Sequence, residues 1–293
     1  MVAVLALGAL ALPSCGTAEA GGRTDDLVVT VEPTTTRVTM APAPTPPRPL
    51  PVAPTTAAPM RLLLLGDGLM WDASPAMQAA ASAMGPSTVE NDSYRGFALS
   101  SPEIRDWRAL WPSYIADFQP TVVAITFGIH DTEPHMSEGV PIDPTTAGWP
   151  DWYASQVHKA MDDLTAGGAV VYWLGMPPVG DPQTNVRITE LNEIVRRAVE
   201  VDPRGRFVDT TAALGVYGGQ AAVTDADGLP LRKTDMLHLC AQGAGALANV
   251  FTTAVSADMG ISVDPAYLTG TWRSAGRYAL DGPHDCRVTT TSR

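Results

Sequence analysis

From Met60 onward the sequence alternates short apolar runs with helical stretches, and this alternation constrains the fold more than any other feature. Strands of a parallel sheet read as nearly unbroken apolar runs because helices cover both of their faces. Such a pattern is typical of repeated βαβ units. We therefore expect an α/β fold, a three-layer α/β/α sandwich with a five-stranded parallel sheet. The expected strands are 61–65, 88–91, 121–127, 169–174 and 206–209, and the expected helices lie near 74–84, 102–118, 149–165, 185–201 and 243–259.

Polar and glycine-containing segments follow the first three strands, and a fourth lies late in the chain. They are Gly66-Asp67-Gly68-Leu69, residues 91–96, Gly128-Ile129-His130-Asp131 and Asp235-Met236-Leu237-His238. In an open parallel sheet, ligands bind in the crevice beyond the carboxyl ends of the strands. We therefore expect these segments to converge on one site.

In this order and at these strand ends, the segments resemble the blocks that define the SGNH (GDSL-type) hydrolase family. The resemblance covers about 60–260 and implies a flavodoxin-like fold and acyl-ester hydrolysis by a serine nucleophile. The family's first block is Gly-Asp-Ser-Leu, and here Gly68 stands in the serine position. The last block, Asp-x-x-His, is matched by Asp235 and His238. The resemblance implies that His238 is the general base and that Asp235 orients it.

The resemblance also implies an oxyanion hole. Gly96 is the best match for the glycine whose amide donates from the second block, and the backbone of Gly68 contributes as well. The third block is Gly-x-Asn-Asp, and His130 stands in the asparagine position. A neutral imidazole there could donate to an oxyanion, and a protonated one could bind a carboxylate. The third interpretation is a tolerated replacement in a site that no longer catalyses.

Gly68 supplies no hydroxyl, so the ordinary mechanism has no nucleophile. In subtilisin, loss of the serine lowers kcat about a millionfold. Ser74, expected on the first helix, and Ser93, expected in the second loop, would need unusual geometry to replace it. A water held by His238 in the space at Gly68 is a further route. We expect serine catalysis to be lost.

Two functions follow from these observations. The first is a hydrolase-like protein that acts on or binds acylated cell-envelope carbohydrate or lipid, with its hydrolytic chemistry impaired or replaced. The second is a non-enzymatic envelope binding module, a pseudoenzyme, that holds an acyl glycan, a peptidoglycan fragment or a partner loop. Backbone amides at Gly66–Gly68 could bind an anion. Aromatic side chains near the loops could stack on sugars, although packing against helices is commoner; they are Trp71, Tyr94, Trp107, Trp149 and Trp152.

A metal centre is another interpretation of the same acidic and histidine residues. Such a centre would have mixed nitrogen and oxygen ligands. The family resemblance accounts for these residues without a metal, so we expect neither a metal nor a cofactor. The residues concerned are Asp67, His130, Asp131, Asp235 and His238.

The N-terminal region indicates export. Residues 2–12 form an apolar run that is too short to span a bilayer, and the Leu-Pro-Ser-Cys-Gly segment ending it resembles a bacterial lipobox. Lipidation of Cys15 would anchor the chain to the membrane outside the cytoplasm. Because no Lys or Arg precedes the run, a plain signal peptide, an uncleaved N-terminus and a start further upstream stay open. The predicted organisation is a signal sequence (1–15), a Thr/Pro/Ala-rich linker (16–59), the SGNH-like domain (60–262) and a C-terminal tail (263–293).

The chain has three cysteines, and lipidation of Cys15 would leave Cys240 and Cys286. An even number in an oxidising compartment indicates a disulfide between them that tethers the tail. Two buried thiols are the alternative.

The formal net charge of −12 excludes one class of partner. Lys and Arg are too few to form a basic stripe along a phosphate backbone, so we expect no nucleic-acid partner.

Overall fold

The computed structural model describes residues 47–216, 219–278 and 286. The predicted signal sequence, the lipidation of Cys15 and most of the predicted linker lie outside the described residues. None of the described helices has the length and apolar character needed to cross a membrane.

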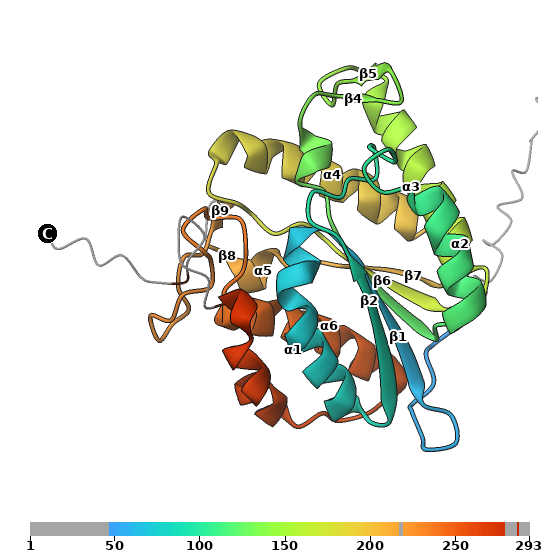
Figure 1. Ribbon diagram of the computed structural model, residues 1–293, viewed down its shortest axis with the longest axis vertical. Coiled ribbons are helices and arrows are strands. Elements are labelled where there is room, and N and C mark those ends of the chain that lie inside the picture. The colour runs from blue at the N-terminus through green and yellow to red at the C-terminus, as the bar shows by residue number, and fades with distance from the viewer. Residues whose placement is uncertain (1–46, 217–218, 279–285, 287–293) are drawn as a thin grey trace, which may run out of the picture. The chain divides into compact units, whose positions relative to one another are not determined.

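A five-stranded parallel sheet forms the centre of the fold (Figure 1). In spatial order its strands are β2 (Ser87–Ser93), β1 (Met60–Gly66), β3 (Val122–Thr126), β6 (Val170–Leu174) and β7 (Gly205–Val208). This is the flavodoxin-like order, in which the chain first builds to one side of β1 and then to the other. The predicted fold class and all five predicted strands are confirmed.

Helices cover both faces of the sheet, and the side chains of β1 alternate between two apolar cores. Leu62 and Leu64 pack with α1 (Gly68–Met84) and α6 (Ala241–Met259) on one face. Leu63 and Leu65 pack on the other face. That face is covered by α2 (Trp107–Phe118), α3 (Trp149–Thr165) and α4 (Pro182–Val199), and a short α5 (Thr211–Leu214) follows β7.

Smaller elements complete the described chain. Two antiparallel hairpins are formed by β4 (His135–Ser137) with β5 (Val140–Ile142) and by β8 (Gly215–Val216) with β9 (Gln220–Ala221). The 3₁₀ turns are η1 (His130–Thr132), η2 (Pro265–Thr269), η3 (Thr271–Ser274) and η4 (Gly276–Tyr278).

Two helices begin five or six residues away from their predicted starts. α1 begins at Gly68 rather than near Ser74, because Asp67 caps it by accepting a hydrogen bond of 2.9 Å from the Leu69 amide. α2 begins at Trp107 rather than near Pro102. The residues before it form turns instead, in which the Ser101 amide donates to the Ala98 carbonyl and the Ile104 amide donates to the Ser101 carbonyl. The apolar pattern alone therefore placed the start of α2 too early.

The segments that flank the domain pack against it. Pro51, in the predicted linker, is buried, and Arg206 donates a hydrogen bond of 2.6 Å to the Pro49 carbonyl. In the tail, a disulfide joins Cys240 to Cys286 with a Cα–Cα distance of 5.5 Å. The predicted pairing of these two cysteines is therefore confirmed.

The disulfide is expected to stabilise the folded domain by closing a loop across a separation of 46 residues. We predict that Cys286→Ser lowers the free energy of unfolding by about 2–4 kcal/mol, measured by urea denaturation. Reducing agent should destabilise the unmodified protein but leave the variant unchanged. Equal stability of the two proteins without reductant would contradict this role.

Candidate active site

The first and last of the four polar segments meet at the carboxyl end of β1. A Cβ atom built on Gly68 would lie 2.4 Å from Nε2 of His238 and 2.9 Å from its Cδ2. Such distances are far inside ordinary van der Waals contact, so the imidazole lies against the backbone of Gly68 in space that a side chain would need. The site therefore lies at the point between β1 and β3 where the strand order reverses, which is where open α/β sheets bind ligands.

Asp235 orients the imidazole of His238. Its Oδ2 lies 2.7 Å from Nδ1 of the ring, and its Oδ1 accepts hydrogen bonds from the amides of Leu237 (3.0 Å) and His238 (2.9 Å). Burial alone would raise the pKa of Asp235, but these hydrogen bonds outweigh it and hold the pKa well below its ordinary value. An ionised Asp235 favours the proton on Nδ1, which makes Nε2, on the Gly68 side, the basic nitrogen of the neutral ring.

The loop that contains Gly96 lies beside the first segment. The amide of Tyr94 donates to the Gly66 carbonyl at 2.8 Å, and the turn that follows holds Gly96 at a φ of 82°. Gly66 itself must be glycine, because a Cβ there would lie 2.0 Å from the Thr126 carbonyl oxygen. The second block thus borders the end of β1, as the sequence predicts.

His130 is the first residue of η1, after β3. Desolvation lowers the pKa of its imidazole, and the charge of His238 acts in the same direction, while Asp131 and Glu133 oppose it. The ring is therefore biased toward its neutral form, which can donate one N–H. Because β3 pairs with β1, His130 lies at the same edge of the sheet as the candidate site.

Asp131 has a structural role, because it bonds to the chain that precedes α2. Its side chain is fully buried and accepts hydrogen bonds from the Ser100 amide (2.8 Å), the Ser100 hydroxyl (2.5 Å) and the Leu99 amide (3.3 Å). Burial raises the pKa of Asp131, and these hydrogen bonds oppose the rise. Asp131 therefore fastens the segment before α2 to the third block.

Asp67 is a second buried carboxylate, at the N-cap of α1. Burial raises its pKa to about 7, although the Leu69 and Gly128 amides and the charge of His238 act in the opposite direction. No cluster of three or more His, Cys, Asp or Glu side chains suited to a metal ion occurs in the described part of the chain.

The two serines considered as alternative nucleophiles are engaged elsewhere. Ser74 is buried in α1, where its hydroxyl donates to the Trp71 carbonyl (3.0 Å) and accepts from Arg277 (2.8 Å). The hydroxyl of Ser93 donates to Oδ1 of Asn91 at 2.7 Å.

The aromatic residues near the loops differ in how deeply they are buried. Trp107 and Trp149 are buried and belong to the core beneath α2 and α3, which is packing rather than sugar stacking. Trp152 packs against the same core while Trp71 is half-buried, and Tyr94 is exposed.

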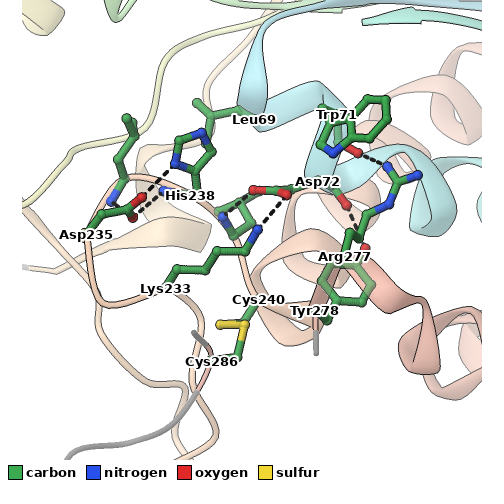
Figure 2. Close-up of polar contacts among 12 residues, drawn as sticks. Leu69, Trp71, Asp72, Lys233, Asp235, His238, Cys240, Arg277, Tyr278 and Cys286 are labelled. Atoms are coloured by element: carbon green, nitrogen blue, oxygen red, sulfur yellow. Dashed lines mark hydrogen bonds and ion pairs between the residues drawn. A yellow bond between two sulfur atoms is a disulfide. The ribbon is translucent and has the colours of Figure 1, made fainter. Parts of the chain in front are cut away.

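An ion pair that the sequence analysis missed joins α1 to the segment that carries His238 (Figure 2). Nζ of Lys233 lies 2.8 Å from Oδ1 of Asp72, and the two side chains are 2% and 0% exposed. Oδ2 of Asp72 accepts from the Leu239 amide at 2.9 Å, and the Lys233 amide donates to the His238 carbonyl at 2.9 Å. Asp72 is the only charged residue of α1. A single charge in an otherwise apolar helix was the sequence feature that could have indicated a buried ion pair.

Fold and site together define a class: a flavodoxin-like α/β/α domain with an aspartate–histidine pair at the strand ends. The chain belongs to the family described as "Protein of unknown function (DUF459)", whose sequence profile matches residues 61–254. No curated protein sequence matches the chain significantly.

Similar solved structures are SGNH or GDSL-type hydrolases, esterases and acylhydrolases. One is a candidate SGNH hydrolase from Slackia heliotrinireducens, with 21% identity over 66% of this chain and 97% of the other, and a TM-score of 0.47. Another is a catalytic mutant of an acetylxylan esterase from Geobacillus stearothermophilus, with 16% identity, 69% and 95% coverage, and a TM-score of 0.47. A third is a GDSL-like lipase from Bacteroides thetaiotaomicron, with 14% identity, 70% and 92% coverage, and a TM-score of 0.48.

The buried ion pair yields a stability prediction. We expect Lys233→Ala to lower the free energy of unfolding by about 3–5 kcal/mol, because it leaves Asp72 as a buried carboxylate without its cation. The double variant Lys233→Met/Asp72→Leu should cost less than the sum of Lys233→Met and Asp72→Leu measured separately by urea denaturation. Strict additivity of the two single effects would contradict the pairing.

Asp67 yields a pH prediction. The folded protein holds this proton up to about pH 7, whereas the unfolded chain releases it near 3.8, so the contribution of Asp67 to stability falls as the pH rises between these values. Asparagine caps a helix equally well but does not titrate. From pH 4 to pH 8, we expect the unfolding free energy of Asp67→Asn to rise relative to the unmodified protein by about 3–5 kcal/mol. A difference that does not change with pH would contradict it.

Proposed function

We propose that this domain binds an acyl ester of cell-envelope carbohydrate or lipid at the carboxyl edge of its sheet, and that serine-dependent ester hydrolysis has been lost from it. The observation that carries the proposal is the contact between His238 and Gly68. The ring nitrogen that would activate a nucleophile lies 2.4 Å from where the Cβ of that nucleophile would be.

Acyl transfer by the serine route needs a nucleophile, an oriented base and donors aimed at the developing oxyanion. The base and its orienting carboxylate are His238 and Asp235, and the candidate donors are the amides of Gly68 and Gly96 with the side chain of His130. The hydroxyl alone is missing. What this arrangement supports is recognition of an ester carbonyl without covalent attack on it.

Export is part of the proposal. The lipobox-like segment at Cys15 and the proline-rich linker suit a domain held outside the cytoplasm on a lipid anchor. The disulfide between Cys240 and Cys286 supports an oxidising compartment. An acyl ester on an envelope glycan or lipid would be within reach of such a domain.

A second candidate function is hydrolysis by water, and the intact pair of Asp235 and His238 favours it. His238 would take a proton from a water molecule, the hydroxide oxygen would bond to the ester carbonyl carbon, and the alcohol would leave with that proton. This route requires the imidazole to withdraw from Gly68 to admit the water.

The test is an assay with 4-nitrophenyl acetate and with O-acetylated xylo-oligosaccharide. We expect no serine-type labelling by a fluorophosphonate and no turnover, together with saturable binding of the acetylated sugar by calorimetry. Turnover that is abolished by His238→Ala, still without labelling, would favour the water route instead. Neither turnover nor binding of any ester would contradict the proposed function.

Gly68→Ser tests the assignment of the missing nucleophile. The new Cβ requires the ring of His238 to withdraw by about 1 Å, which restores ordinary contact. We expect esterase activity at least about tenfold above the background rate measured with the unmodified protein, a small part of the roughly millionfold that the serine contributes in subtilisin. The gain should vanish in Gly68→Ser/His238→Ala, with Gly68→Ala as the matched control that adds bulk without a hydroxyl. A folded Gly68→Ser variant with no activity would contradict His238 as a competent base.

A further inference from the structure

Two arginine side chains stack on Trp71, one turn of α1 beyond Gly68. The guanidinium carbon of Arg277 lies 4.5 Å from the centroid of the Trp71 ring, and that of Arg95 lies 5.7 Å from it. Since both distances refer to the same ring, the two cationic groups are at most about 10 Å apart. This concentration of positive charge occurs in a chain whose net charge is −12.

Arg277 donates a hydrogen bond to a carbonyl that a proline leaves without its helical partner in α1. In an α-helix the Trp71 carbonyl would accept from the residue four positions on, but that residue is Pro75, which has no N–H. Arg277 of the tail donates to this carbonyl and to the Ser74 hydroxyl instead, as Figure 2 shows for the carbonyl. The next residue, Tyr278, donates to the Asp72 carbonyl at 2.6 Å. These hydrogen bonds therefore fix the position of the Arg277 guanidinium group.

Arg95 is exposed, and its charge is not neutralised by a carboxylate in the described ranges. The neighbouring Arg105 differs, because its guanidinium pairs with Asp92. Within the same ranges Arg277 too has hydroxyl and carbonyl partners only. Among the described residues, therefore, neither guanidinium group on Trp71 is paired with a carboxylate.

This arginine–tryptophan patch borders the candidate active site. Arg95 directly precedes Gly96, the candidate oxyanion donor, and the amide of Tyr94 is bonded to Gly66 at the end of β1. Trp71 lies in the first turns of the helix that begins at Gly68. A ligand with its ester at Gly68 can therefore reach the patch with a group a few bonds away.

We propose that Arg95, Arg277 and Trp71 form an anion subsite that binds a phosphate or carboxylate group on the same ligand whose acyl ester lies at Gly68 and His238. The placement of the ester rests on the proposed function, whereas the anion binding does not. Guanidinium groups bind such oxyanions through paired N–H donors. Two like charges on one aromatic ring repel each other, and an anion that contacts both relieves this repulsion. The ligand class is accordingly an acylated carbohydrate or lipid that carries phosphate or carboxylate.

The experiment measures binding of sn-glycerol 3-phosphate and of glucuronate to the purified chain by calorimetry at low salt, with glycerol and glucose as uncharged controls. We expect at least one anion to bind more tightly than its uncharged control, and affinity to fall in 0.5 M salt. Arg95→Gln should weaken binding about five- to tenfold. This variant is chosen because Arg95 makes no hydrogen bond in the described ranges, whereas Arg277 also anchors the tail. Arg204→Gln, at the opposite edge of the sheet, removes the same charge and should leave the affinity unchanged.

Equal affinity for charged and uncharged probes, or unchanged affinity in Arg95→Gln, would overturn the subsite. The stronger of the two anions shows whether the subsite prefers a phosphate or a carboxylate. Binding of uncharged O-acetylated xylo-oligosaccharide separates the two proposals. If that ester binds and no anion does, the anion subsite fails alone; if anions bind through Arg95 and no ester binds, the proposed function fails and the subsite stands.

Discussion

The carboxylate of Asp72 receives hydrogen bonds from both ends of the segment that carries His238. Nζ of Lys233 reaches one oxygen and the Leu239 amide reaches the other. Because Asp72 is one turn beyond Gly68 on the same helix, these bonds fix the distance between the helix start and the imidazole. A buried cation without this partner would be strongly unfavourable, so the backbone on either side of His238 has little freedom to move, while the imidazole ring can still rotate about its own side-chain bonds. The geometry of the candidate active site depends on this interaction.

The sequence predicted the sheet well and the edges of helices less well. Strands such as Val170–Leu174 were recognisable because burial on both faces demands an unbroken apolar run. The start of α1 was not, because it depends on a side chain to backbone hydrogen bond at Asp67 rather than on hydrophobic periodicity. The start of α2 has no side-chain cap, and the backbone turns that precede it do not follow from hydrophobic periodicity. A contact made by a single polar atom leaves almost no trace in a pattern of residue types.

For the candidate site, the sequence predicted which segments meet but not how they meet. The order of the blocks placed His238 near Gly68, and the two lie together in the structure. Two features could not be predicted from the sequence. The first is that the imidazole of His238 fills the space next to Gly68. The second is that Lys233 lies buried against Asp72, a pairing across 161 residues that no local sequence motif predicts. The Trp71 patch was also out of reach, because it joins three segments distant in sequence.

The proline at position 75 has a consequence for where this domain ends. Because Pro75 has no N–H, the Trp71 carbonyl accepts instead from the Ser74 hydroxyl and from Arg277, which lies beyond residue 254, where the family match stops. A protein fragment cut at that match would lose the Arg277 hydrogen bond to α1 and the Tyr278 ring from the core. Boundaries chosen for expression should therefore include Arg277, Tyr278 and Cys286, whose contacts reach back to the domain.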